Sequence, residues 1–188
     1  MAIGVLCLQG GYDAHIRSLE RLRQKVVRVT EPSDLEKISG LIIPGGESTT
    51  IGKLMVFHGL IEPLKHKISC GFPVFGTCAG MILLSGGAEG YEQTLVGGID
   101  IRVTRNAYGR QIESFDTRVP VDFPQGTHEV SAVFIRAPRI SYRGPLVKVL
   151  AELDGHPIVV QQGSLLASSF HPELTQDLSM HRHFLTLH

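Results

Sequence analysis

The sequence FGTCAG (residues 75–80) places a cysteine between two glycines, directly after the apolar residues 73–75. The spacing Gly76-x-Cys78-x-Gly80 is the thiol counterpart of the nucleophile elbow, in which a tight turn between a strand and a helix presents the nucleophile. Glycines are needed there because a side chain would clash with neighbouring elements. A thiol at the start of a helix also lies near the positive end of the helix dipole, which favours the reactive thiolate. The stretch therefore predicts a strand–turn–helix unit with Cys78 as the nucleophile. The alternative is a buried structural cysteine beside a chance pair of glycines.

Strand and helix patterns alternate on both sides of this turn. Continuous apolar runs that end in glycine are typical of buried parallel strands, and apolar residues at helical spacing lie between these runs. Such alternation with short connections indicates a parallel sheet that helices cover on both faces. The expected strands are residues 2–9, 25–29, 40–46 and 72–77, and the expected helices begin near residues 13, 33 and 79.

The second half of the chain has a different sequence pattern, in which short apolar runs are joined by turns. These runs are residues 98–103, 112–122, 131–136, 147–153, 157–162 and 165–170. We expect them to extend the sheet with antiparallel strands, and we expect residues 175–187 to close the chain as a helix. No repeat, linker or low-complexity tract divides the sequence, so we expect one domain over residues 1–188. The predicted fold class is α/β, with three layers: a mostly parallel central sheet, helices on both faces and an antiparallel extension.

Composition narrows the class of function. Lys and Arg total 18, as do Asp and Glu, so no net charge attracts nucleic acid or an anionic membrane. Three cysteines in 188 residues argue against a disulfide framework and for a reducing compartment. The apolar residues 2–8 lack a basic flank and are too short for a signal peptide or a membrane span. We therefore expect a cytoplasmic protein.

A reactive cysteine needs a base and a group that orients the base. The sequence SSFHPE (residues 168–173) offers both, since His171 and Glu173 follow an apolar strand and lie two residues apart. In extended backbone, residues i and i+2 point to the same side, and Pro172 biases His171 towards extended geometry. A lone histidine at a strand end is more often a surface residue, but the pair with Glu173 favours a Cys-His-Glu triad.

Three loops follow expected strands, at residues 9–11, 45–48 and 77–79, and ligands in open parallel sheets bind at the carboxyl ends of strands. Acyl chemistry also needs donors for an oxyanion. The elbow itself places the backbone N–H of Ala79. A second donor is Gly46, where a glycine lets the peptide approach the substrate or change orientation.

The glycine loop has a competing interpretation, because residues 45–53 superficially match a phosphate-binding P-loop. The match fails at two positions. Glu47 stands where the first glycine is needed, and Leu54 follows Lys53 where serine or threonine is required. We therefore do not expect a nucleotide site.

The motifs PGGEST, GTCAG and FHPE, in this order, resemble those of class I glutamine amidotransferase domains, which have a flavodoxin-like fold and a Cys-His-Glu triad. Three more segments are similar to the glutaminase subunit of pyridoxal phosphate synthase: LQG (8–10), RNAYGRQIESF (105–115) and FIRAPRI (134–140). The triad motifs are shared by the whole class, whereas the RNAYGR and IRAPR stretches are specific to this subunit. The resemblance covers nearly the whole chain.

The resemblance implies a reaction. Cys78 would attack the side-chain amide of L-glutamine to give a glutamyl thioester and ammonia, His171 would move the proton, and Glu173 would orient His171. An arginine suits the α-carboxylate of the substrate. The residues that match glutamine contacts of the family are Gly46, Glu47, Ser48, Arg105, Ile135 and Arg136.

The resemblance also implies a partner and no cofactor. Ammonia would pass to a separate synthase subunit that builds pyridoxal 5'-phosphate (vitamin B6), in a large hetero-oligomeric complex with glutaminases around a synthase core. Such glutaminases are weak alone and become competent on docking, when the glycine loop completes the oxyanion hole. Gln9 and the first helix, with His15, would lie at the interface. Gly11 departs from the bulkier residue that relatives carry.

Several alternatives remain open at this point. In the first alternative, the chain is a glutaminase subunit of another amidotransferase, such as that of histidine biosynthesis, although residues 105–115 and 134–140 argue against this assignment. In the second alternative, the chain is a free-standing cysteine hydrolase or peptidase, which would act on peptides or γ-glutamyl conjugates. In the third, it is a binding module, and Cys78→Ala would then have no effect in any assay. A metal site is not expected, since His181 and His183 lie two apart in an expected helix and point to opposite sides.

Overall fold

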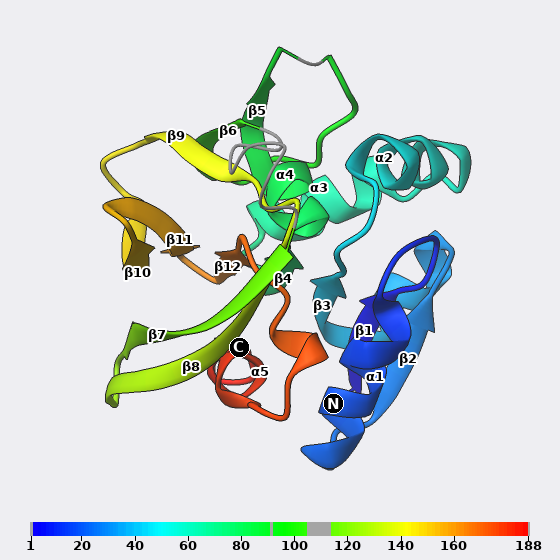
Figure 1. The fold of residues 1–188 in the computed structure, drawn as a ribbon. Helices are drawn as coiled ribbons and strands as arrows, with labels where there is room; N and C mark the ends of the chain where they lie inside the picture. The colour runs from blue at the N-terminus through cyan, green and yellow to red at the C-terminus, as the bar shows by residue number, and fades with distance from the viewer. Residues whose placement is uncertain (1, 91, 105–113, 188) are drawn as a thin grey trace.

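Seven strands form the central sheet, in the order β10–β11–β12–β4–β3–β1–β2 (Figure 1). The computed structural model describes residues 2–90, 92–104 and 114–187. Neighbours from β12 to β2 run parallel, and β11 and β10 continue the sheet antiparallel. The strands are β1 Ala2–Leu6, β2 Val26–Val29, β3 Ile38–Ile43, β4 Val74–Thr77, β10 Lys148–Leu153, β11 His156–Gln162 and β12 Leu165–Ser168. The predicted mostly parallel sheet with an antiparallel extension is confirmed.

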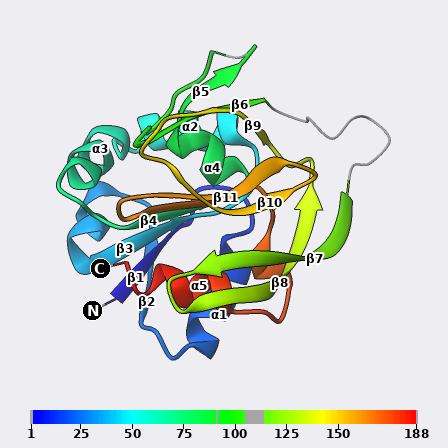
Figure 2. The same cartoon turned by 90° about the vertical axis from the view of Figure 1, so that its left-hand side faces the viewer.

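Helices cover both faces of this sheet. Figure 2 shows α1 and α5 on one side, and α2, α3 and α4 on the other. The α-helices are α1 Tyr12–Arg21, α2 Ser48–Phe57, α3 Ile61–Ser69, α4 Ala79–Leu84 and α5 Ser179–Phe184, and the 3-10 helices are η1 Pro32–Lys37 and η2 Pro172–Leu174. Each face of the sheet has its own hydrophobic core, which explains why the central strands are apolar along their whole length.

The strands between α4 and β10 correct the prediction that every run in the second half extends the main sheet. A three-stranded sheet contains β5 Ser85–Glu89, β6 Ile99–Thr104 and β9 Arg139–Arg143, and a separate hairpin pairs β7 Ser114–Phe123 with β8 Gly126–Ile135. Alternate residues of β7 from Val119 onward are buried and those between them are exposed. One apolar face of the hairpin therefore packs over the central sheet as a layer, beside α5, instead of adding to its edge (Figure 2).

Two predicted helices differ in extent. The expected helix at residues 175–187 is the short α5, preceded by η2. The expected short helix after Ser33 is the 3-10 helix η1, whose N-cap is Glu31 in a capping box with Asp34. The capping box of η1 is made by side chains, and periodicity alone does not reveal it.

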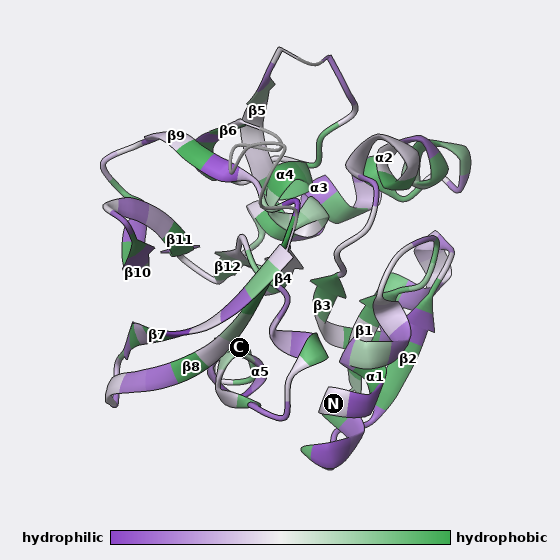
Figure 3. Cartoon of the chain, in the orientation of Figure 1, coloured by the Kyte–Doolittle hydropathy of each residue, from purple (hydrophilic) through white to green (hydrophobic). Residues whose placement is uncertain are grey.

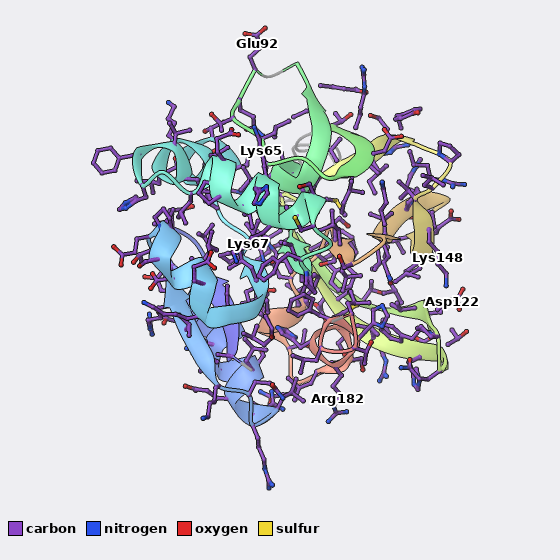
Figure 4. The ribbon with its side chains drawn as sticks, turned by 180° about the vertical axis from the view of Figure 1, so that it is seen from behind. Lys65, Lys67, Glu92, Asp122, Lys148 and Arg182 are labelled. Carbon is purple, nitrogen blue, oxygen red and sulfur yellow. The ribbon has the colours of Figure 1, made fainter. Side chains whose placement is uncertain are left out.

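Hydrophobic residues concentrate in the central strands and α4, whereas the hairpin carries hydrophilic residues towards its outer end (Figure 3). Figure 4 shows charged side chains of both signs pointing outwards around the molecule, among them Lys65, Lys148, Asp122 and Arg182. None of the helices in the described part of the chain is long and apolar enough to cross a membrane.

Candidate active site

Cys78 lies in the turn between β4 and α4, as the sequence predicts, and is the N-cap residue of α4. Its backbone has φ 49° and ψ −100°, a conformation that non-glycine residues adopt only when the surrounding structure enforces it. The glycine requirement is also explained. A Cβ atom on Gly80 would lie 2.2 Å from the carbonyl oxygen of Ile43, so the helix approaches β3 too closely for any side chain. The turn holds the thiol in a strained, fixed position.

A pocket of about 260 Å³ opens beside the thiol. It lies at the carboxyl ends of β1, β3 and β4, where the sequence places the three loops, and β8 closes its side. This volume is at the small end for ligand sites and suits one amino acid better than a folded peptide. Its lining residues are Gln9, Gly46, Glu47, Ser48, Cys78, Ala79, Ile82, Ile135, Arg136 and His171. The structure thus brings together the two oxyanion candidates, Cys78 and the expected base.

His171 and Glu173 contact each other as predicted, but by a different backbone geometry. The Nδ1 atom of His171 lies 2.7 Å from the Oε1 atom of Glu173. Pro172 does not continue an extended segment, because it begins the 3-10 helix η2, which carries Glu173. The tight turn folds the carboxylate back towards the imidazole. Since Nδ1 is held by Glu173, the other ring nitrogen remains for Cys78.

The charges of this group support one another. Burial alone would lower the pKa of His171, but hydrogen bonds and electrostatic interactions with Cys78 and Glu173 raise it to about 10. Burial would raise the pKa of Glu173, but the nearby His15 and the hydrogen bond with His171 lower it below its ordinary value. The resting site therefore holds a protonated imidazole between a carboxylate and the cysteine.

The glycine loop after β3 is held by the loop after β1. The carbonyl oxygen of Gly45 accepts a hydrogen bond from the N–H of Gly11 at 2.9 Å, and the N–H of Glu47 donates to Oε1 of Gln9 at 3.0 Å. The imidazole of His171 packs directly on this loop, because a Cβ atom on Gly45 would lie 2.2 Å from its Cε1. Any movement of the glycine loop is therefore transmitted to the neighbourhood of the base.

Glu47 and Ser48 line the pocket, but their side chains are engaged in the protein. The Glu47 carboxylate caps α2, where it accepts hydrogen bonds from the backbone N–H groups and the hydroxyls of Thr49 and Thr50. These bonds outweigh the effect of burial and lower the pKa of Glu47 to about 2. The Ser48 hydroxyl is buried and donates to Oε1 of Gln93 at 3.0 Å. The contribution of Glu47 and Ser48 to a ligand is thus largely positional.

The pocket wall opposite the glycine loop comes from the end of β8. The carbonyl oxygen of Ile135 lies 3.8 Å from the Cys78 sulfur. Arg136 is exposed at the rim and has φ 45°, so a second non-glycine residue of this pocket adopts the left-handed region. Arg105, which the sequence predicts as a further contact, lies outside the described residues.

His15 is not at the surface. Its side chain is fully buried, with Nδ1 3.0 Å from Nε2 of His181 and Nε2 3.1 Å from the hydroxyl of Thr77. The same Nε2 lies 3.5 Å from Oε2 of Glu173. This burial speaks against the predicted interface contact of His15, which instead lies behind the candidate catalytic pair. Its pairing with His181 could not be read from local sequence, because the two residues lie 166 positions apart.

Gln9 is half-buried at the mouth of the pocket, where a partner that reaches the glycine loop would meet it. Among the residues that the structure describes, no group of three histidine, cysteine or acidic side chains is arranged to hold a metal ion.

Comparison with known proteins gives a consistent set of relatives. The model of the "SNO glutamine amidotransferase family" matches residues 5–187. A "Pyridoxal 5'-phosphate synthase subunit PdxT" of Carboxydothermus hydrogenoformans is 50% identical, over 98% of this chain and 96% of the relative. The protein of the same name from Thermotoga neapolitana is 46% identical, over 100% of this chain and 99% of the relative.

Solved structures agree with this result. A structure described as "Crystal structure of glutamine amidotransferase" superposes with a TM-score of 0.94 at 45% identity, covering 100% of this chain and 98% of that one. A putative GMP synthase subunit from Thermoplasma acidophilum has a TM-score of 0.67 at 18% identity, over 100% of this chain and 93% of that one. The second likeness shows the shared fold alone.

Proposed function

The chain belongs to the SNO glutamine amidotransferase family, and from that premise we propose that its Cys78 site hydrolyses L-glutamine and supplies the ammonia to a pyridoxal 5'-phosphate synthase. The strongest support is the arrangement of a strained cysteine, a protonated histidine and a buried carboxylate around one small pocket. We further propose that residues 1–188 act as a single glutaminase domain.

The first half of the reaction forms a thioester. The Cys78 sulfur attacks the side-chain carbonyl carbon of glutamine, and the carbonyl electrons move to the oxygen. The backbone N–H groups of Ala79 and Gly46, which both line the pocket, are the candidate donors to this oxyanion. When the intermediate collapses, the C–N bond breaks, and His171 donates its proton to the leaving nitrogen. Ammonia is released and a glutamyl group remains on Cys78.

The second half restores the enzyme. His171, now neutral, accepts a proton from water as the water attacks the thioester carbonyl. The C–S bond breaks, and glutamate leaves. Glu173 keeps its contact with His171 Nδ1 throughout, so the ring orientation is the same in both halves and the imidazolium is stabilised whenever it forms.

Substrate binding is assigned to the two walls of the pocket. Arg136 at the rim suits the α-carboxylate of glutamine. The family resemblance adds Arg105, which lies outside the described residues, as a second contact. On the opposite wall, the backbone around Gly46, Glu47 and Ser48 contacts the amide end. The Glu47 carboxylate acts indirectly, because it fixes the start of α2 and with it the path of this backbone.

The partner is assigned to the surface around Gln9. Its side chain holds the glycine loop through the N–H of Glu47, and Gly45 in the same loop packs on His171. A synthase subunit that contacts Gln9 and α1 would therefore act on the oxyanion donor and the base through one loop. This coupling gives a physical reason for a glutaminase that works only in its complex.

The test measures glutamate release and pyridoxal 5'-phosphate formation by this chain with a synthase subunit, its two sugar phosphate substrates and glutamine. We expect both products, and we expect Cys78→Ala to abolish both. The matched control replaces glutamine with an ammonium salt, which should restore pyridoxal 5'-phosphate in the Cys78→Ala mixture. Glutamate release that is strong without the synthase and unchanged by it would instead indicate a free-standing hydrolase. No glutamate release under any condition would contradict the proposal.

A further inference from the structure

A chain of polar side chains continues behind the Cys78 site into the interior. Glu173 uses Oε1 for His171, and its Oε2 faces Nε2 of His15 at 3.5 Å. His15 in turn contacts Thr77 on β4 and His181 on α5. His15 and His181 are both 0% exposed, so water does not reach them. The chain thus joins α1, η2 and α5, and Figure 2 shows α1 and α5 on the same side of the sheet.

The contacts select one tautomer for each of the two histidines. A proton on Nε2 of His15 is favoured, because the N–H then donates to the Thr77 hydroxyl at 3.1 Å and presents its positive end, instead of a lone pair, to the Glu173 carboxylate at 3.5 Å. Neutral His15 then has a lone pair at Nδ1, which accepts a hydrogen bond from Nε2–H of His181. The remaining nitrogen, Nδ1 of His181, has no hydrogen-bond partner within the described residues. With these tautomers, Nδ1 of His181 is an acceptor without a partner. With the opposite tautomers, Nδ1 of His181 would be a buried N–H without a partner, and a lone pair on Nε2 of His15 would point at the Glu173 carboxylate.

Burial disfavours the charged form of both histidines. Burial lowers the pKa of His15 in spite of the nearby Glu173 carboxylate. Burial also lowers the pKa of His181, to about 3, with His15 and Arg21 acting in the same direction and Glu173 and Asp177 opposing them. The two histidines therefore place polar N–H groups beside Glu173 without adding a net charge that would compete with the His171 imidazolium.

We propose that His15, supported by His181, is a positioning residue for the glutaminase reaction: its Nε2, which Thr77 holds, faces the second oxygen of Glu173 at 3.5 Å and stabilises the carboxylate electrostatically, so that the first oxygen keeps His171 aligned. The proposal rests on the proposed glutamine hydrolysis. Oε2 of Glu173 is buried without a hydrogen-bond partner among the described residues, and Nε2 of His15, at 3.5 Å, is the polar nitrogen that faces it, so loss of His15 would leave this oxygen against apolar surroundings. The carboxylate would then rotate or take up a proton, and His171 would lose its anchor.

A pair of substitutions separates positioning from packing. The amide of glutamine reaches about as far as Nε2 of histidine, whereas the amide of asparagine reaches about as far as Nδ1. His15→Gln therefore keeps a donor near Glu173, and His15→Asn keeps only the contact towards His181. The matched control is Ser18→Ala, which removes another buried polar group of α1 whose hydroxyl donates to the carbonyl of Ala14, away from the site.

In the complex with a synthase subunit, we expect His15→Asn to lower kcat for glutamate release about tenfold with KM within about twofold, because Glu173 acts through His171 and does not touch substrate. The acidic limb of kcat/KM should also move to higher pH. His15→Gln and Ser18→Ala should stay within about threefold of wild type. Equal losses in all three variants, or a change in KM alone, would overturn the positioning role.

A measurement on the unmodified protein covers the case in which the variants fold poorly. Nitrogen-15 NMR of the histidine rings reports tautomers and charge without any need for activity. We expect neutral Nε2–H forms for His15 and His181 at neutral pH, and a protonated His171. An Nδ1–H or doubly protonated His15 would overturn the inference. A wild-type protein that shows the expected tautomers but releases no glutamate would instead contradict the proposed function.

Discussion

The strand β4 has a cysteine, a histidine and a glutamate near each of its ends, and the two sets differ in almost everything except residue type. Near the amino end, a surface pocket is lined by Cys70, His66 and Glu36, among others. At the carboxyl end are Cys78, His171 and Glu173. Cys70 is exposed and caps the end of α3, where the helix dipole disfavours a negative charge, whereas Cys78 is 7% exposed and begins α4.

The difference shows that the same three residue types form a reactive site only where the surrounding structure holds their side chains in place. Glu173 is buried and holds His171 at 2.7 Å, whereas Glu36 is exposed and pairs with Lys67. No hydrogen bond joins the side chains of His66, Cys70 and Glu36, all of which the structure describes. Exposed side chains also pay for any alignment in entropy and are screened by water. The predictions below test this contrast, from the largest expected effect to the smallest.

Removal of each thiol gives the largest contrast. We expect Cys78→Ala to lower glutamate release in the presence of a synthase subunit by about 10⁴-fold or more, because no other group forms the acyl intermediate. Cys70→Ala should stay within about twofold of wild type. The circular dichroism spectra of both variants should match that of the parent protein. Near-normal turnover by Cys78→Ala would place the chemistry elsewhere.

Removal of the base and of its anchor should separate their roles. We expect His171→Ala to cost about 10³- to 10⁴-fold in kcat, and Glu173→Ala to cost less, about 10²- to 10³-fold, because the carboxylate orients and stabilises but does not transfer the proton. His66→Ala near Cys70 is the matched control and should leave kcat unchanged. If Glu173→Ala equals wild type, the carboxylate has no part in the site.

Crowding of the base tests its position without removing any functional group. A Cβ atom on Gly45 would lie 2.2 Å from Cε1 of His171, so Gly45→Ala must displace the ring or the loop. We expect a loss of about 10²-fold in kcat, which is typical of a misplacement near one ångström. Gly86→Ala is the control, since its Cβ would only meet the carbonyl oxygen of Ile101 at 3.5 Å. Equal rates for the two variants would show that the His171 position is not critical.

The pH dependence gives the smallest and most specific effect. The pKa of Glu173 is lowered from 4.5, so its stabilising effect is present above that value and is lost as pH falls through the folded-state pKa. The pKa of His171 is raised from 6.5 to about 10, so its stabilising effect is present below 6.5 and is lost as pH rises towards 10. We therefore expect kcat/KM to vary by less than about threefold between pH about 6 and 9. A midpoint near 6.5, as for an ordinary histidine, would contradict the charged pair.

Much of the parallel half of the fold was predictable from the sequence, because apolar runs that end in glycine mark buried strands with little ambiguity. The hairpin β7–β8 and the sheet β5–β6–β9 were not. Strand β6 and the second half of β7 alternate buried and exposed residues, a pattern that fixes which face is covered but not which sheet the strand joins. Which sheet a strand joins depends on pairing with strands far away in the sequence, and local sequence patterns do not identify these partners.

The parts of the site that lie within short sequence motifs were predictable from the sequence. The elbow around Cys78 and the pair of His171 with Glu173 each lie within a few residues, so spacing reveals them. His15 and His181 meet only through the packing of α1 against α5, and Glu47 turns out to cap α2. The family resemblance had suggested His15 for the interface, and local sequence does not show that its side chain is turned inwards.

The most direct test of the contrast between the two ends of β4 is to map the cysteine that reacts with a chloroketone analogue of glutamine. The protein is incubated with the reagent and a synthase subunit, with and without excess glutamine, and the peptides are identified by mass spectrometry. We expect the label on Cys78 alone, with protection by glutamine, although Cys70 is the more exposed thiol. Labelling of Cys70 at a similar rate, or labelling of Cys78 that glutamine does not prevent, would contradict the assignment of the Cys78 pocket as the glutaminase site.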